Sequence, residues 1–164
     1  MPPGARSQRR TPRADAGEAF ELALGNTIDS VETARAALEQ LFAAHALPAG
    51  AVHRLEVVLE ELVSNVIRHG FTPGSNQSIH LRCSIMAGLV TFVLEDDGTP
   101  FDPLQAPEPR PFDRIETAAL GGLGLALVRK LAASFRYERA DPRAPHGEGG
   151  FAPVNRVTVQ LVID

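Results

Sequence analysis

The sequence predicts an α/β protein, a two-layer α+β sandwich in which helices cover one face of a mixed, mostly antiparallel sheet. The chain has 164 residues, of which 44% are hydrophobic and 22% charged, as is typical of a globular protein with one substantial core. Its apolar patterns run in the order β-α-α-β-β-loop-α-β-β, without an internal repeat. This order of elements favours one sheet with its helices together on one side.

The first sixteen residues differ from the rest of the chain. Residues 1–16 are rich in proline, arginine and glycine and have no apolar period, so we expect a disordered arm. The domain is then expected to cover residues 17–164.

The first half of the domain is predicted to hold a strand and two helices. Alternating apolar residues predict a strand over residues 20–25, and helical periods follow over 29–46 and 51–69. Gly70 comes directly after the second helix, where a left-handed glycine ends many helices.

The second half begins with a predicted hairpin. Residues 78–86 and 89–96 both have the composition of strands, and Ala87-Gly88 between them suits a tight turn. Residues 97–120 contain five prolines and little period, so they are expected to form a long loop of the kind that often covers a binding site. The chain is predicted to end with a glycine-led helix, a strand, a Pro/Gly-rich loop and a last strand, at residues 121–135, 135–140, 141–153 and 155–163.

Composition excludes several classes of protein. A net charge of −4 argues against direct nucleic-acid binding, and no apolar run reaches the length of about 18 residues that a membrane span needs. We therefore expect a cytoplasmic protein. Cys83 is the only cysteine and lies in an apolar strand, so it is expected to be a buried, inert thiol. Lys130 is the only lysine, which weighs against Schiff-base chemistry and a Walker-type phosphate site.

The second predicted helix carries polar residues at the border of its apolar arc. Glu61 and Asn65 lie one turn apart there. A carboxylate and an amide at this spacing, half shielded from water, can share a bound water or a hard cation. Taken alone, the pair is better explained by an ordinary amphipathic helix, because polar pairs at this spacing are common.

Two later segments also carry candidate binding residues. Asp96 ends a strand just before Gly98, and such an aspartate can accept a hydrogen bond from an exocyclic amine. Gly122 and Gly124 begin a helix whose free amides would suit phosphate. Each segment alone has a simpler interpretation, an Asp-Asp-Gly turn and a glycine-rich helix start.

Together, in this order and spacing, the three segments resemble the ATP-binding boxes of the Bergerat-fold (GHKL) histidine-kinase-like ATPase superfamily. Within it, the chain is most similar to the single-domain anti-sigma-factor serine/threonine kinases of the RsbW and SpoIIAB type. The similarity runs from about residue 18 to the C-terminus. The boxes comprise Glu61 to Asn65 with His69-Gly70, Asp96 to Asp102, and Gly122 to Leu125.

The resemblance implies a role for each residue. Asn65 would ligate the Mg²⁺ that bridges the ATP phosphates, and Glu61 would be the general base. Asp96 would read the adenine amino group, with Gly98 leaving room for the ring. The residues expected beside the triphosphate are Gly122, Gly124 and Leu125.

Other positions have less defined roles in this resemblance. Residues 103–120 would form the lid over ATP, in which Arg110 and Arg114 are the cationic candidates to touch phosphate. Thr158 would reach adenine through a water. Two further candidates at the end of the second helix are Arg68 and His69.

The chain departs from the superfamily pattern in three places, one of which is the expected lid, where no lysine is available. Pro100 stands where a second glycine is usual, a variant similar to that of the anti-sigma-kinase branch. The predicted loop at 141–153 is longer than the fold needs, which puts the usual partner surface in doubt.

The resemblance implies an ATP-dependent serine kinase that sequesters a sigma factor and phosphorylates a STAS-domain anti-anti-sigma antagonist, with a homodimer expected from the family. An alternative is an ATP-binding regulatory module of a partner-switching system that has no kinase turnover. A third is a stand-alone relative of the histidine-kinase ATPase domain. The third ranks last because the helix that carries His45 is too short to present a phosphoacceptor.

Overall fold

A computed structural model describes residues 19–71, 77–107, 122–141 and 152–163 of the chain. Its elements confirm the predicted order, with one addition, a short 3₁₀ helix in the long loop. In chain order they are β1 (Ala19–Gly25), α1 (Asp29–Ala44), α2 (Ala49–His69), β2 (Ser78–Met86), β3 (Leu89–Asp96), η1 (Pro103–Gln105), α3 (Gly122–Leu131), β4 (Ser134–Ala140) and β5 (Val154–Val162). The predictions for residues 1–16 and for most of the loops at 97–120 and 141–153 lie outside the described residues.

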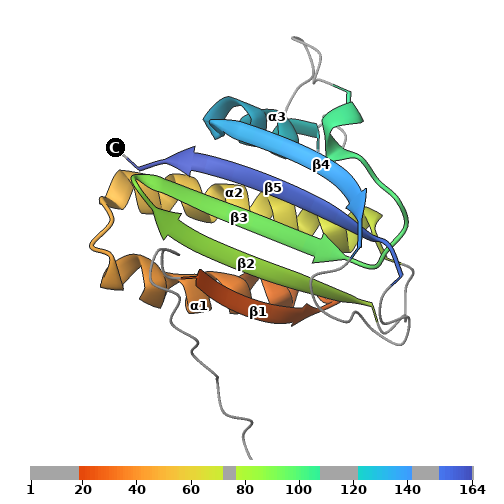
Figure 1. The fold of residues 1–164 in the computed structure, drawn as a ribbon, viewed down its shortest axis with the longest axis horizontal. Helices are drawn as coiled ribbons and strands as arrows, with labels where there is room; N and C mark the ends of the chain where they lie inside the picture. The colour runs from red at the N-terminus through yellow and green to blue at the C-terminus, as the bar shows by residue number, and fades with distance from the viewer. Residues whose placement is uncertain (1–18, 72–76, 108–121, 142–151, 164) are drawn as a thin grey trace, which may run out of the picture.

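The strands form one sheet in the order β1-β2-β3-β5-β4 (Figure 1). Every pair of neighbours among the described strands is antiparallel. The prediction of a mixed sheet was therefore wrong in this detail. The last strand, β5, inserts between β3 and β4 and runs opposite to both, so these two parallel strands are never neighbours.

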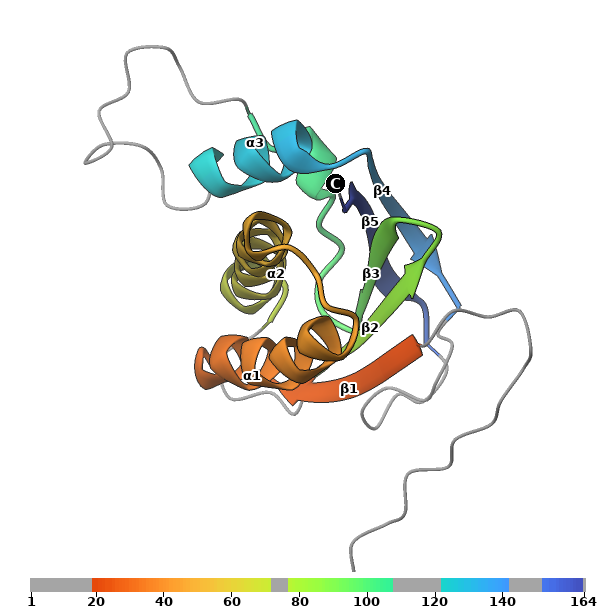
Figure 2. The same ribbon diagram turned by 90° about the vertical axis from the view of Figure 1, so that its left-hand side faces the viewer.

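The helices α1, α2 and α3 all cover the same face of the sheet (Figure 2). The core lies between these two layers and includes Phe42, Leu55 and Phe92, each at most 2% exposed. None of the helices in the described ranges is long and apolar enough to cross a membrane.

The strand alternation predicted for β2 is confirmed, since Ile79, Leu81 and Cys83 are buried in the core. Burial raises the pKa of the Cys83 thiol to about 12, as expected of an inert thiol. The turn after β2 has positive φ at Ala87 and Gly88, 50° and 76°, which matches the twist of a two-residue hairpin.

Gly70 does not end α2 in the predicted left-handed conformation, because its φ is −88°. It continues the helical hydrogen bonding, and its N–H lies 2.7 Å from the Val66 carbonyl oxygen. In this conformation the Gly70 carbonyl accepts a hydrogen bond from the Thr99 N–H at 2.8 Å. The end of α2 is therefore joined to the turn that follows β3.

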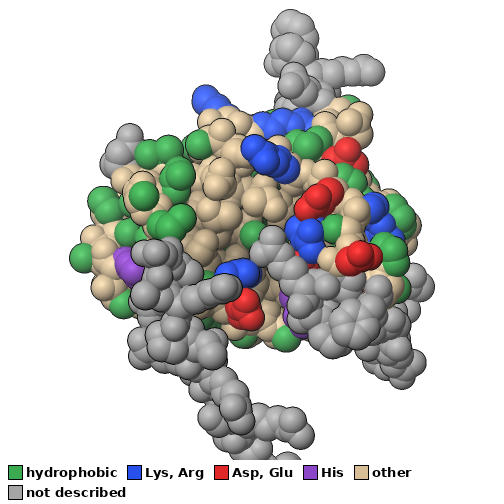
Figure 3. Space-filling model, viewed as in Figure 1, with side chains coloured by type: hydrophobic (Ala, Val, Ile, Leu, Met, Phe, Trp, Pro, Cys, Tyr) green, Lys and Arg blue, Asp and Glu red, His purple; other side chains and the backbone are tan. Residues whose placement is uncertain are grey.

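The helix-free face of the sheet carries charged side chains (Figure 3). Arg156 on β5 pairs there with Glu95 at 2.6 Å and with Glu138 at 3.0 Å. Glu95 is only 3% exposed, so its charge is stabilised by this arginine rather than by water.

Candidate functional site

A cavity opens between α2, the end of β3, the loop that follows β3, and β5. Its lining brings two of the predicted segments together, because Asn65 from α2 and Asp96 from β3 both contribute. The lining residues are Leu62, Asn65, Val66, Gly70, Leu94, Asp96, Phe101, Pro103, Asn155 and Val157. The cavity is thus mostly apolar with a few polar groups, as is typical of a small-molecule site.

Asn65 contributes an unpaired polar atom to this region. The residue is 8% exposed, and its Oδ1 is buried without a hydrogen-bond partner among the described residues. A buried carbonyl oxygen normally has a partner, so this atom is suited to a bound water or cation.

Glu61 lies one turn before Asn65 and contacts α3. Its carboxylate occupies the space in which a Cβ of Gly124 would lie. Burial raises the pKa of Glu61, and the nearby charge of Arg68 partly opposes that shift. A half-buried carboxylate of raised pKa beside a helix start is well suited to accept a proton.

The first turn of α3 holds the other predicted phosphate neighbours. Gly122 is the first residue of the helix, and the Leu125 side chain is 2% exposed. Neither Glu61 nor Gly122, Gly124 or Leu125 lines the cavity, and the contact of Glu61 with Gly124 joins α2 to the first turn of α3 beside it. Their proposed contact with phosphate remains a prediction.

Asp96 is 4% exposed at the end of β3. Its Oδ1 accepts hydrogen bonds from the Gly98 N–H at 3.0 Å and from the Asn155 Nδ2 at 2.9 Å. Burial raises the pKa of Asp96, while the two hydrogen bonds lower it. Both bonds fall on Oδ1, and none of the hydrogen bonds found among the described residues reaches Oδ2, so this second carboxylate oxygen can accept a hydrogen bond from a ligand.

Asn155 is a site residue that the sequence analysis missed, and the suggestion of Thr158 was wrong. In the register of β3 and β5, Asn155 lies opposite Asp96, whereas Thr158 lies opposite Val93 on the helix-free face. The sequence could have indicated Asn155, because alternate side chains of a strand lie on the same face of the sheet. Asn155 is two residues before Val157, which was predicted to face inward.

Gly98 is required by a close backbone contact, and its role beside the adenine ring stays a prediction. A Cβ on this residue would overlap the backbone carbonyl of Gly70 at the end of α2. Next to this contact, the rings of His69 and Phe101 stack with centroids 5.0 Å apart. His69 thus packs against a residue that lines the cavity, and a role for it in the site stays a prediction.

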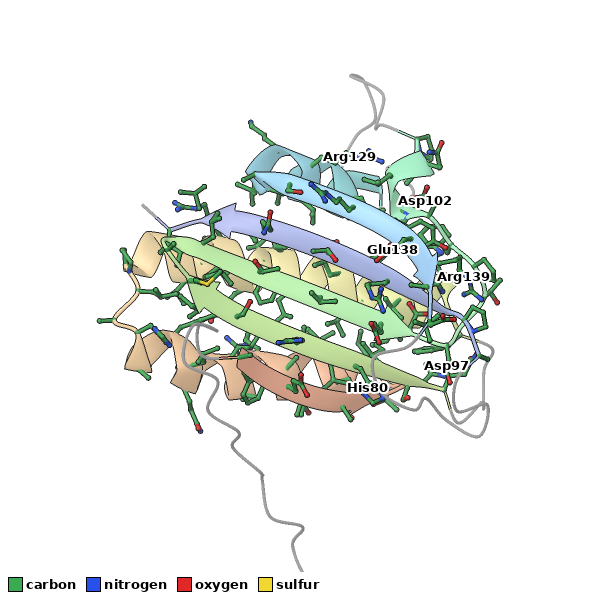
Figure 4. All side chains as sticks on the ribbon, in the orientation of Figure 1. His80, Asp97, Asp102, Arg129, Glu138 and Arg139 are labelled. Atoms are coloured by element: carbon green, nitrogen blue, oxygen red, sulfur yellow. The ribbon has the colours of Figure 1, made fainter. Side chains whose placement is uncertain are left out.

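The loop after β3 is anchored to α3 before it leaves the described residues. Arg129 Nη2 donates to the carbonyl oxygens of Pro103, Leu104 and Ala106 at 2.9–3.0 Å. Figure 4 shows Arg129 beside the segment that carries Asp102, whose carboxylate caps η1. The candidate phosphate ligands Arg110 and Arg114 lie outside the described residues.

The sequence matches the family model for the histidine kinase-like ATPase domain over residues 24–147, which is most of the chain. The chain belongs to the histidine kinase-like ATPase family. The match includes all three predicted boxes, and a domain of this family implies ATP binding. The cavity between α2 and β3 is accordingly the candidate ATP site.

Two relatives of this histidine kinase-like ATPase are informative. Over 87 residues it is 33% identical to the serine/threonine-protein kinase BtrW of Bordetella bronchiseptica, a match that covers 53% of this chain and 61% of that protein. Its fold is similar to the RsbU and RsbW domains of Rv1364c from Mycobacterium tuberculosis, with a TM-score of 0.58 and 21% identity. That match covers 95% of this chain and 34% of the other. The chain thus spans less than two thirds of either relative.

Proposed function

We propose that this protein is an ATP-dependent serine/threonine protein kinase that acts as an anti-sigma factor. It sequesters a sigma factor and phosphorylates a serine of a STAS-domain anti-anti-sigma protein. The similarity to the kinase BtrW and the fold shared with an RsbW domain support this function. It is expected to act in the cytoplasm as a homodimer.

One observation carries the proposal. The buried Oδ1 of Asn65 has no partner among the described residues, while Asp96 lines the same cavity and Glu61 lies one turn away. These residues offer an acceptor for the adenine amino group, an oxygen ligand for a metal ion and a carboxylate of raised pKa that could serve as general base, which together suit binding of ATP and transfer of its γ-phosphate.

The donor set fits Mg²⁺ held jointly by protein and nucleotide. In the described parts of the chain, no group of three or more His, Cys, Asp or Glu residues could hold a metal ion. Mg²⁺ commonly binds through one or two protein oxygens together with substrate phosphates and waters. Asn65 Oδ1 would be the protein ligand. When bound, the ion would neutralise charge that develops on the phosphates.

Each residue then has a defined task. Asp96 accepts a hydrogen bond from the adenine amino group and so orients the base. Glu61 accepts the proton of the substrate hydroxyl as its oxygen bonds to the γ-phosphorus and the bond to the leaving ADP oxygen breaks. Gly122, Gly124 and Leu125, in the first turn of α3, would bind the phosphates through their backbone amides.

The proposal is tested by mixing the protein with Mg²⁺, γ-labelled ATP and purified STAS-domain proteins. We expect label on a serine of one of them with the native chain, and loss of transfer in Glu61→Gln. Nucleotide binding should survive in that variant. Glu60→Gln is the matched control, because Glu60 is an exposed carboxylate on the same helix.

A second readout does not depend on turnover. Asn65→Ala should remove the dependence of ATP affinity on Mg²⁺, which calorimetry measures directly. Transfer that is unchanged in Glu61→Gln would remove Glu61 from its role. ATP binding by the native chain without transfer to any STAS protein would favour a regulatory module without kinase turnover.

A further inference from the structure

Asp96 belongs to a hydrogen-bonded network that extends to the edge strand of the sheet. Asn155 Nδ2 donates to Asp96 Oδ1 and to the Thr99 carbonyl, both at 2.9 Å. On its other side, Asn155 Oδ1 accepts from the Tyr137 hydroxyl at 2.8 Å and from Arg139 Nη1 at 3.2 Å. A single side-chain amide thus connects the buried carboxylate to β4.

The chemistry of the partners fixes the orientation of this amide. Arg139 has only donors, so the atom of Asn155 that faces it must be the oxygen. The Tyr137 hydroxyl donates to the same atom at 2.8 Å, which is consistent with an oxygen in that position. Figure 4 shows Arg139 at the end of β4, on the side of the sheet where Asp97 follows β3.

With the oxygen turned toward β4, the NH₂ group of Asn155 must face Asp96. The bond it donates, together with the Gly98 N–H, occupies Oδ1 and stabilises the ionised carboxylate. The remaining Oδ2 is then an acceptor without a proton. In the reverse orientation the amide oxygen would face the carboxylate, and protonated Asp96 would be favoured.

We propose that Asn155, held by Tyr137 and Arg139, is a positioning residue that makes this site select a 6-aminopurine over a 6-oxopurine nucleotide. This inference rests on the proposed ATP-binding function. A 6-amino group donates a hydrogen bond to Oδ2, whereas a 6-oxo group places a second acceptor against a carboxylate. Loss of the Asn155 amide removes a hydrogen bond that favours the ionised carboxylate of Asp96. The preference for a 6-aminopurine over a 6-oxopurine nucleotide is then reduced.

The experiment measures affinities for Mg·ATP and Mg·ITP, which differ in the base at position 6. We expect the native protein to prefer ATP. In Asn155→Ala the ATP-to-ITP affinity ratio should fall about tenfold, as expected for the loss of a hydrogen bond to a charged group. Tyr137→Phe, which retains the ring and Arg139, should lower the ratio by a smaller factor.

The matched control is Gln160→Ala. Gln160 is also an amide on β5, but it lies opposite Thr91 on the helix-free face. Its removal should leave the ratio unchanged. A pH series adds a second readout, since ATP affinity in Asn155→Ala should begin to fall at a higher pH than in the native protein.

The outcomes separate the two proposals. Equal losses of ATP and ITP affinity in Asn155→Ala and Tyr137→Phe, with an unmoved pH profile, would assign Asn155 a structural role and overturn this inference alone. Binding of ATP with the expected ratios but without phosphoryl transfer would support the inference and reject the kinase. Failure of the folded native chain to bind ATP would overturn both. Should Asn155→Ala fail to fold, Tyr137→Phe decides the question.

Discussion

The carboxylate of Glu61 on α2 lies where a Cβ of Gly124 on α3 would have to be. This contact joins two segments that are about sixty residues apart, and it brings a candidate general base to the start of a helix. Only a glycine at position 124 permits it. The neighbour is the end of a flexible side chain, so an added methyl group can displace it without breaking backbone structure.

Gly124→Ala is therefore expected to impair chemistry and spare stability. Alanine in a helix is favoured over glycine by roughly 0.5–1 kcal/mol, so the free energy of unfolding should stay level or rise. Phosphoryl transfer should fall at least about tenfold, because Glu61 is displaced from its position. Urea unfolding and a transfer assay on the same preparation measure both effects.

Gly50→Ala is the control for that prediction, since its Cβ would find only a side-chain atom of Arg54 at 4.0 Å. Both variants exchange a helical glycine for alanine, and only the one at 124 displaces Glu61. Equal activity in the two variants would contradict the proposed importance of the Glu61 position.

Gly98→Ala, unlike Gly124→Ala, is expected to reduce the stability of the fold. Its Cβ would overlap the backbone of Gly70, which cannot move without loosening the end of α2 and the 2.8 Å hydrogen bond from Thr99. The free energy of unfolding should fall by about 1–3 kcal/mol, as for other overpacked positions. Gly25→Ala, where the nearest atom lies 4.0 Å from the added Cβ, should cost much less in the same urea titration.

The pH dependence of binding follows from Asp96, whose pKa burial raises above its ordinary value. In the nucleotide-free protein, folding favours the protonated carboxyl, so its contribution to stability is present at low pH and lost as the pH rises through the raised pKa. The amino group of adenine donates a hydrogen bond, and the ionised carboxylate of Asp96 is the form that accepts it. ATP affinity should therefore fall as the pH is lowered through that raised pKa.

The measurement is a calorimetric titration with Mg·ATP between about pH 4 and 8. It is best made in the Glu61→Gln variant, because burial also raises the pKa of Glu61 and would add a second transition. Affinity that stays constant to the acid end of this range would show that Asp96 does not read the base in its ionised form.

Arg129 is expected to hold the beginning of the loop against α3. Its Nη2 donates to three carbonyl oxygens of residues 103–106. Arg129→Met keeps much of the side-chain volume but leaves these acceptors without their donor, and should reduce stability by about 1–3 kcal/mol. Hydrogen exchange should rise in the peptide that covers residues 101–107. Lys130→Met, on the exposed side of the same helix, is the control and should leave that peptide unchanged.

Local pattern was sufficient for the order and type of the elements, and the family resemblance pointed to two residues of the cavity. The predicted strands and helices lie close to their observed positions, and Asn65 and Asp96 line one cavity as the resemblance implied. Periodicity of apolar residues is a local property, and each element follows it. The prediction failed at Gly70, where the helical hydrogen bonding continues and the carbonyl accepts a hydrogen bond from Thr99, a residue distant in the sequence.

The sequence by itself determined the order of elements, the buried faces and the three segments that carry polar chemistry, because these depend on neighbouring residues along the chain. Only the tertiary structure decided that Asn155 faces Asp96, that Gly98 packs on Gly70, and that Glu61 fills the space beside Gly124. These relationships depend on which strands pair and how closely backbones approach. Both are set by packing between segments far apart in the chain, which no local pattern encodes.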